Sequence, residues 1–235
     1  MSIFINSKNS IVEVLKTNHK IIKAFVIKDT NHALVKDLNK RNVTIEYLDK
    51  LTFSKKFKDA HQGISLEITD YQYYPLEKAL KERKENPLYL MLDGISDPHN
   101  FGAILRSCDA SGVDLVIIPR DRSVSLNETV AKVSTGAIEH VKVAQVTNLN
   151  QTIKKLKDEG FWICGTDASG TINYYDLDCN MPICLVIGSE GEGMHELVKK
   201  NCDFILSIPM VGHVNSLNAS VSTGILLFDI MRKRS

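Results

Sequence analysis

The sequence predicts an α/β protein in two parts: a small N-terminal α/β module and a larger domain whose parallel β-sheet is covered by helices on both faces. Strand-like and helix-like stretches alternate along both parts. From Leu88 onward several strand candidates are continuous apolar runs, which is typical of parallel strands buried on both faces. Between the parts lies a heavily charged stretch bracketed by two prolines. We therefore expect three segments, residues 1–74, 75–87 and 88–235.

In the N-terminal segment, short apolar runs alternate with helix-favouring stretches. A strand that begins at Ile3 should lead into a helix capped near Asn9 or Ser10. Further strands are expected at residues 21–27, 43–47 and 65–68, and further helices at 32–40 and 51–58.

The N-terminal segment is also basic. It holds 12 lysine and arginine residues against 8 aspartate and glutamate residues, a net charge of +4 in a chain whose net charge is +1. Such a module suits binding to a polyanion, and an ordinary solvated surface is the alternative. His61 could contact RNA or be a surface turn residue. The charged stretch 75–87 is expected to be a solvated helix or a flexible connector.

The C-terminal segment shows a regular alternation of strands and helices. Gly112 and Gly160 stand where helices are expected to end. The predicted strands are residues 88–92, 113–119, 141–146, 161–166, 183–187 and 204–208. The predicted helices are residues 101–111, 125–138, 149–159, 194–201 and 217–231.

Composition excludes several classes of protein. The five cysteines contain no Cys-x-x-Cys pair, which indicates reduced thiols and a cytoplasmic protein. The seven histidines form no His-x-x-x-His pair, so we expect no metal site. No apolar run has membrane-spanning length and the N-terminus lacks a signal-peptide core, so we expect no membrane partner.

Three loops leave the C-terminal end of a predicted strand and enter a helix, and ligands of open α/β sheets bind at that edge. The first covers residues 92–106, LDGISDPHNFGAILR. Asp97-Pro98 starts a turn, and Asn100 is expected to cap the helix. Arg106 follows on a largely apolar helix, where a guanidinium needs an anionic partner, either a ligand or a nearby acid.

The second loop covers residues 187–194, IGSEGEGM. Its glycines allow close backbone approach by a ligand. Their spacing, Gly-x-x-Gly-x-Gly, differs from the dinucleotide fingerprint Gly-x-Gly-x-x-Gly, and no phosphate loop is present. Glu190 and Glu192 would repel a di- or triphosphate, so a neutral or cationic cofactor fits better. Glu190 could also pair with Arg106.

The third loop covers residues 208–224, IPMVGHVNSLNASVSTG. Asn215, Ser216 and Asn218 offer neutral hydrogen-bonding groups that could orient a ribose or a phosphate. A capped helix start with no ligand is the alternative. No Ser/His/Asp order indicates acyl transfer, and a hydrolase that uses His99 or His213 is a weaker alternative.

Together these three stretches, in this order and spacing, strongly resemble the three motifs of the SpoU (TrmH) class of RNA ribose 2′-O-methyltransferases. The resemblance implies that residues 88–235 form a SPOUT domain with a deep trefoil knot. Residues 1–74, with the helix start at 9–13 and the segment 61–64, look like the L30e-like RNA substrate-binding domain of that class. This domain pairing is similar to that of members that methylate guanosine in 23S rRNA. The chain departs from the usual motifs at Ser7, Phe101 and Ala219, and none of these changes removes a functional group.

The resemblance implies S-adenosyl-L-methionine as methyl donor, rRNA as partner, and a homodimer with the active site close to the subunit interface. Sequence positions that match the class's active-site residues are Asn100, Arg106, Glu190, Ser216 and Asn218. Positions that match its cofactor-binding residues are Gly188, Glu190, Ile208, Pro209, Met210 and Leu217. The carboxylates of Glu190 and Glu192 suit the positive charge of the sulfonium group in this cofactor.

Alternatives remain for the RNA substrate and for the role of Arg106. Arg106 is either a general base or a cation that holds RNA phosphate and stabilises the developing alkoxide. The substrate is 23S rRNA or, in the alternative, tRNA. A non-catalytic RNA-binding relative is a third possibility, against which the intact Asn100, Arg106, Glu190 and Asn218 argue.

Overall fold

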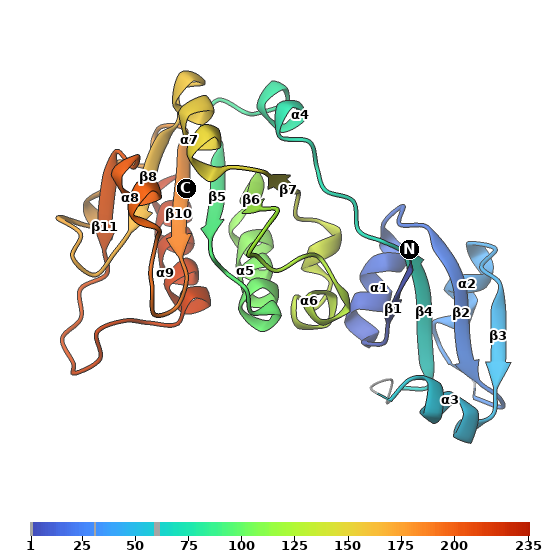
Figure 1. The fold of residues 1–235 in the computed structure, drawn as a ribbon. Helices are drawn as coiled ribbons and strands as arrows, with labels where there is room; N and C mark the ends of the chain where they lie inside the picture. The colour runs from blue at the N-terminus through green and yellow to red at the C-terminus, as the bar shows by residue number, and fades with distance from the viewer. Residues whose placement is uncertain (1, 31, 59–61) are drawn as a thin grey trace. The chain divides into compact units, whose positions relative to one another are not determined.

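The computed structural model describes residues 2–30, 32–58 and 62–235, so His61 lies outside the described residues. The chain divides into two compact units, coloured along the chain in Figure 1. Unit 1 comprises Met1–Gln72 and Leu126–His140, and unit 2 comprises Tyr73–Ser125 and Val141–Ser235. The segment Leu126–His140 therefore belongs to the N-terminal unit, although the sequence placed it in the C-terminal domain.

Unit 1 is built on a four-stranded sheet of order β1-β4-β2-β3, antiparallel except for the parallel pair β2–β3. Phe25, Phe53 and Phe57 form an aromatic core against this sheet. Its strands are β1 (Ser2–Ile5), β2 (Ile21–Ile27), β3 (Ile45–Leu48) and β4 (Ile64–Thr69). Its helices are α1 (Lys8–Lys16), α2 (Val35–Lys40), α3 (Lys50–Lys56), α6 (Glu128–Val133) and the short η1 (Ala137–Glu139).

Helix α1 begins earlier than predicted. Ser7, not Asn9 or Ser10, is its N-cap, because the Ser7 hydroxyl accepts a hydrogen bond from the Ser10 backbone N–H at 3.3 Å. Strand β2 covers the predicted residues 21–27, which confirms that prediction.

The segment Leu126–His140 is not the continuous helix that the sequence predicted. Thr135 (φ 53°) and Gly136 (φ 98°) adopt left-handed backbone conformations, which end the helical run after α6. A Cβ on Gly136 would lie 2.4 Å from Cγ of Glu13, so a glycine is needed where the segment packs on α1. The Ser10 hydroxyl also donates to the Ala131 carbonyl at 2.8 Å.

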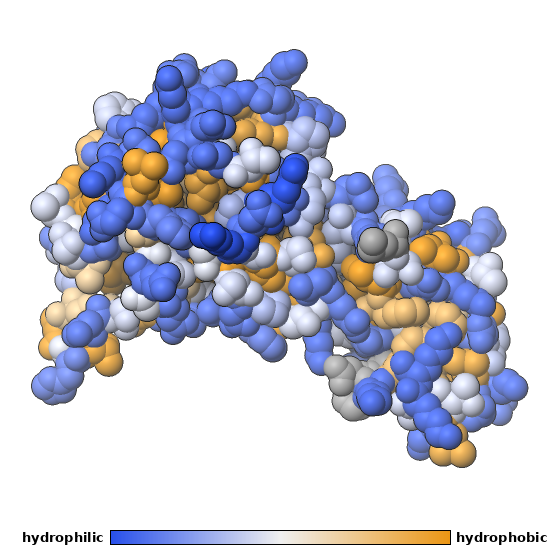
Figure 2. Space-filling model, viewed as in Figure 1, coloured by the Kyte–Doolittle hydropathy of each residue, from blue (hydrophilic) through white to orange (hydrophobic). Residues whose placement is uncertain are grey.

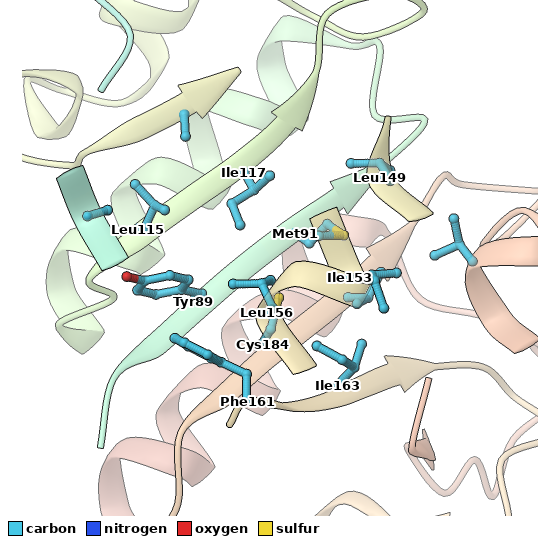
Figure 3. Packing of buried hydrophobic residues seen from close by; sticks show 14 of the residues in the cluster. Tyr89, Met91, Leu115, Ile117, Leu149, Ile153, Leu156, Phe161, Ile163 and Cys184 are labelled. Carbon is cyan, nitrogen blue, oxygen red and sulfur yellow. The ribbon is translucent and has the colours of Figure 1, made fainter. Parts of the chain in front are cut away.

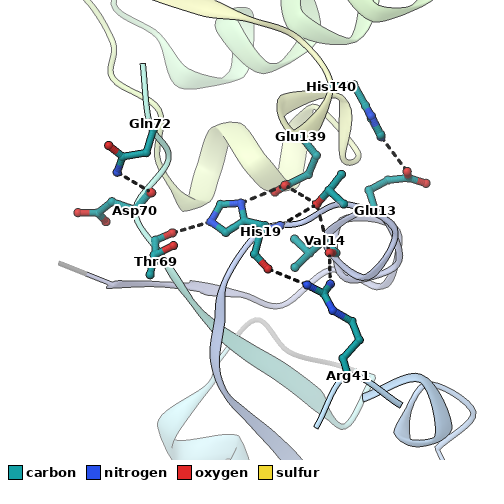
Figure 4. A network of polar contacts seen from close by, with 10 residues as sticks. Glu13, Val14, His19, Arg41, Thr69, Asp70, Gln72, Glu139 and His140 are labelled. Atoms are coloured by element: carbon teal, nitrogen blue, oxygen red, sulfur yellow. Dashed lines mark hydrogen bonds and ion pairs between the residues drawn. The ribbon is translucent and has the colours of Figure 1, made fainter. Parts of the chain in front are cut away.

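A polar network joins the end of this segment to the rest of unit 1 (Figure 4). His19 Nδ1 lies 3.0 Å from Oε2 of Glu139, and Nε2 lies 2.8 Å from the Thr69 carbonyl oxygen. Burial lowers the pKa of His19, but the hydrogen bonds to Glu139 and to Thr69 outweigh it, and the net shift is upward. Because both ring nitrogens face oxygen acceptors, the doubly protonated imidazolium fits this position.

Unit 2 has a seven-stranded sheet of order β7-β6-β5-β10-β8-β11-β9 in which every pair is parallel, so the predicted parallel α/β domain is confirmed. The strands are β5 (Leu88–Asp93), β6 (Leu115–Pro119), β7 (Val143–Val146), β8 (Trp162–Thr166), β9 (Ile172–Asn173), β10 (Ile183–Gly188) and β11 (Phe204–Ser207). The helices are α4 (Leu76–Lys81), α5 (Pro98–Ser111), α7 (Leu149–Asp158), α8 (Glu196–Lys200), α9 (Ala219–Lys233) and the short η2 (Tyr174–Asp176). The trefoil knot stays a prediction.

Helices cover both faces of this sheet. Helices α4, α7 and α8 share a core with alternate strand residues such as Tyr89, Met91 and Cys184 (Figure 3). Helices α5 and α9 pack against each other on the opposite face (Figure 1). Ala79 and Leu80 of α4 are buried in the core, so part of the charged stretch 75–87 is neither a solvated helix nor a flexible connector.

The described surface is mostly hydrophilic on the side seen in Figure 2, with apolar side chains in small patches. All five cysteines are free thiols, and four of them are buried. Within the described residues, no cluster of three His, Cys, Asp or Glu side chains could hold a metal ion. None of the helices seen in the described ranges is both long and apolar enough to span a bilayer.

Candidate functional site

The sheet of unit 2 brings the first two predicted loops together. Strands β5 and β10 are parallel neighbours in a register that pairs Gly188 with Asp93, so both strands end at the same level. The loops that follow them must therefore leave the sheet side by side, at its C-terminal edge. The third loop follows β11, which β8 separates from β10, and it crosses this edge to reach the start of α9.

Helix α5 presents Asn100 in its first turn. Asp97, not Asn100, is the N-cap: its carboxylate accepts from the backbone N–H groups of His99 (3.0 Å) and Asn100 (3.3 Å). Pro98 occupies the first helical position, where its missing N–H is not needed. The Asn100 side chain is consequently free to contact the other loops.

Asn218 connects the three loops. Its Nδ2 donates to Oδ1 of Asn100 at 2.9 Å and to Oε2 of Glu190 at 3.2 Å. Asn100 Nδ2 in turn donates to the same Glu190 oxygen at 3.4 Å. The Asn218 Oδ1 caps α9 by accepting from the Ser220 backbone N–H at 2.9 Å. The sequence offered a helix cap and a polar ligand site as alternatives for this loop. The Asn218 side chain both caps the helix and takes part in the polar site.

The glycine-rich loop is a closed turn. Ser189 and Gly193 exchange two backbone hydrogen bonds of 3.0 Å, which leave Glu190, Gly191 and Glu192 at the tip. A Cβ on Gly188 would lie 2.2 Å from the backbone of residues 193 and 194. Gly188 therefore makes room for the loop's own returning backbone, whereas the sequence suggested room for a ligand.

A cavity of about 270 Å³ opens beside this loop. Six of the ten predicted catalytic or cofactor-binding residues line it, whereas Asn100, Arg106, Pro209 and Asn218 do not. The predicted residues that line it are Gly188, Glu190, Ile208, Met210, Ser216 and Leu217. Its charged lining residues are Asp167, Glu190 and Glu192, and no lysine or arginine lines it. The arrangement suits a neutral or cationic ligand.

Arg106 lies apart from these contacts. Its side chain is exposed on α5 and makes no hydrogen bond or ion pair with any residue that the structure describes. The suggested pairing with Glu190 and the internal ion pair are therefore both wrong. An exposed guanidinium without a protein partner is available to an external anion.

The sequence did not predict two features at the C-terminal edge of the unit 2 sheet. Thr166, the last residue of β8, lines the cavity together with Asp167 and Ala168, which follow it, but β8 leads to a short strand and not to a helix. The rule that ligands gather at the C-terminal ends of strands could have identified them. The second feature is the contact between buried Asp93 and His195, which lie 102 residues apart and have no local pattern in common.

Comparison with known proteins gives two family matches. A model of the SpoU rRNA Methylase family matches residues 87–228, and a model described as RNA 2′-O ribose methyltransferase substrate binding matches residues 8–74. A Bacillus subtilis protein named for the TrmH family of tRNA/rRNA methyltransferases is 42% identical over 239 residues, 99% of this chain and 96% of its own length. A Staphylococcus aureus protein named for the same family is 44% identical over 234 residues, 97% of this chain and 94% of its own length.

Solved structures share the fold. The SpoU methyltransferase AviRb from Streptomyces viridochromogenes, crystallised with AdoMet, has a TM-score of 0.87 at 19% identity and covers 99% of this chain and 90% of its own. An AdoMet-bound rRNA methyltransferase from Sinorhizobium meliloti has a TM-score of 0.84 at 21% identity, with 98% and 87% covered. The TrmH/SpoU tRNA modifying enzyme of A. aeolicus is 33% identical, with a TM-score of 0.59 and 68% and 80% covered.

Proposed function

The chain belongs to the SpoU rRNA methylase family, and we propose that it transfers a methyl group from S-adenosylmethionine to the ribose 2′-hydroxyl of a guanosine in 23S rRNA. The observation that carries the proposal is the joining of Asn100, Glu190 and Asn218 by hydrogen bonds at the rim of an acidic cavity. These side chains come from three separate loops, so their convergence makes one site of three motifs.

The cavity fits S-adenosylmethionine by its charge and its walls. The cofactor carries a sulfonium cation and no phosphate, which agrees with the carboxylates of Glu190 and Glu192 and with a lining that has no lysine or arginine. Apolar side chains of Ile187, Leu206 and Ile208 offer a surface for a purine ring. A volume of about 270 Å³ is near the lower end for a small-molecule site.

Within this proposal, the protein side chains orient and activate the ribose hydroxyl. S-Adenosylmethionine, when bound, supplies an electrophilic methyl group. The amides of Asn100 and Asn218 fix the Glu190 carboxylate by donating to one of its oxygens, which leaves the other oxygen to accept a hydrogen bond from substrate. The exposed Ser216 hydroxyl in the cavity wall can position the same ligand.

Arg106 is assigned the role of a cation. It is exposed and has no carboxylate partner within the described chain, and a guanidinium in a protein keeps its proton. A fixed positive charge here would hold an RNA phosphate and stabilise the alkoxide that develops on the 2′-oxygen.

The pH–rate profiles of wild type and Arg106→Lys separate the two roles. For a cationic role, Lys should retain activity within about tenfold, with the same pH dependence as wild type, because the positive charge is kept. Arg106→Gln, of similar length and uncharged, should lose about a hundredfold or more. A new ionisation in the Lys profile, with low activity below it, would instead establish a general base.

The substrate proposal rests on the N-terminal segment of residues 1–74, whose sequence is basic and of which residues 8–74 match the substrate-binding family. Its test is transfer of labelled methyl from S-adenosylmethionine to undermethylated 23S rRNA and, in parallel, to unmodified tRNA. Mass-spectrometric mapping of the nucleosides then identifies the position. Label in a 23S guanosine 2′-O-methyl group supports the proposal, and label confined to tRNA would replace it with the tRNA alternative.

A further inference from the structure

Asp93 is a buried carboxylate at the base of the glycine-rich loop of residues 189–193. It is the last residue of β5, it is 3% exposed, and both of its oxygens interact with His195. Oδ2 accepts from the His195 backbone N–H at 2.8 Å, and Oδ1 lies 2.8 Å from the ring Nδ1. A buried carboxylate is costly unless it is paired in this way, so the two residues hold each other.

His195 stands where the loop returns from its tip. Strand β10 holds the loop at Gly188, which pairs with Asp93 in the sheet, and the bridge between Ser189 and Gly193 closes the turn. The backbone then passes Met194 and enters α8 after His195. The sheet therefore fixes the start of the loop at Gly188, and the interaction with Asp93 fixes its end at His195.

We propose that Asp93, acting through His195, is a positioning residue for the cofactor loop of residues 189–193. It holds the loop in the conformation in which Glu190 faces the cavity and meets Asn100 and Asn218. The inference deepens the proposed function and rests on it for the identity of the ligand. The His195 ring is largely exposed and makes no hydrogen bond to any other described residue, so its place depends on Asp93.

Three variants test the inference without touching a residue that contacts the ligand. His195→Ala removes the ring donor. His195→Asn retains a donor, because the Asn side-chain amide occupies nearly the place of Nδ1. Lys200→Ala changes an exposed residue at the far end of α8 and is the control. Thermal unfolding establishes that all three are folded.

The first readout is hydrogen exchange at residues 188–195 in cofactor-free protein, and the second is the calorimetric Kd for S-adenosylmethionine. His195→Ala should exchange faster in this loop and bind about tenfold more weakly, the usual effect of losing a hydrogen bond to a charged group. Its KM for S-adenosylmethionine should rise more than its kcat falls. His195→Asn should restore most of both readouts, and Lys200→Ala should equal wild type.

Wild-type exchange and affinity in His195→Ala would overturn the inference, as would equal losses in the Ala and Asn variants. If wild type itself bound no S-adenosylmethionine, the proposed function would fail. Loop exchange, which needs no ligand, would still decide whether Asp93 and His195 hold the loop.

Discussion

Single side chains at this site have more than one role. Asn218 caps α9 through its oxygen and joins Asn100 to Glu190 through its nitrogen. Its replacement by Ala would remove a helix cap, worth about 1 kcal/mol, together with the contacts at the site. Asn218→Asp keeps the capping oxygen and places two carboxylates together, so it isolates the second role.

Asp167 and Lys199 form a second pair beside the cavity, with Lys199 Nζ 2.7 Å from Oδ2 of Asp167. The hydrogen bond from Lys199, followed by that from Ser169, lowers the pKa of Asp167 to about 2. Because this pKa lies below the usual 3.8, the stabilisation is present above pH 3.8 and is lost as the pH falls toward 2.

Lys199→Met should lower the free energy of unfolding at pH 7 by about 1 kcal/mol, a value kept small because both side chains are about a quarter exposed. The difference from wild type should shrink as the pH falls below 4. Urea unfolding between pH 3 and 7 measures it, with Lys200→Met as the control for loss of an exposed lysine on α8. Equal stability of Lys199→Met and wild type at pH 7 would contradict the prediction.

At the scale of elements, the short helix η1 is held by a histidine far away in the sequence. His19 pairs with Glu139, whose side chain is almost fully buried, and contacts the Thr69 carbonyl. The pKa of His19 is raised above its usual 6.5, so the stabilisation is fully present below pH 6.5 and is lost as the pH rises through the raised value.

His19→Gln should lower the free energy of unfolding by about 1–2 kcal/mol at pH 6, because it removes a charged hydrogen-bond donor from Glu139. At pH 9 the variant and wild type should differ less, because the wild-type ring loses its proton as the pH rises through its raised pKa. Chemical unfolding at both pH values checks this. The control is His99→Gln, which replaces an exposed histidine of unit 2. A larger difference at pH 9 than at pH 6 would refute the assignment of the imidazolium.

Sequence periodicity predicted the strands of unit 2 well, because continuous apolar runs such as 88–92 and 183–187 are buried on both faces whatever lies around them. It failed at residues 125–138, where the break depends on the packing of Gly136 against Glu13, a contact across more than 120 residues. The three loop motifs predicted Asn100, Glu190 and Asn218. The cap at Asp97 and the pair of Asp93 with His195 depend on side-chain geometry that no spacing reveals.

At the scale of the whole molecule, α9 carries an exposed apolar stripe. Val221, Phe228 and Met231 are 50%, 43% and 37% exposed and lie on one helix face, since they are spaced by seven and three residues. This stripe supports the homodimer that the family resemblance predicts, because contiguous exposed apolar surface commonly marks a protein–protein contact.

If the predicted homodimer forms through this stripe, Phe228→Glu should weaken dimerisation about a hundredfold or more, because a carboxylate would be buried without a partner. Sedimentation velocity over a range of protein concentrations measures the shift toward monomer. Leu197→Glu makes the same kind of change at a 59%-exposed position on α8 and should leave the association state unchanged. An unaltered dimer in Phe228→Glu would exclude α9 from the interface.

The segment Leu126–His140 makes the backbone pass between the two units three times, after Gln72, Ser125 and His140. Unit 1 is consequently assembled from two separate lengths of chain, with Val130, Ala131 and Ile138 of the second length buried. Cleavage between residues 72 and 73 would leave the pieces bound together. Residues 1–72 and 73–235, made as separate polypeptides, should therefore bind each other and complete unit 1. Co-purification through a tag on one polypeptide would detect this association.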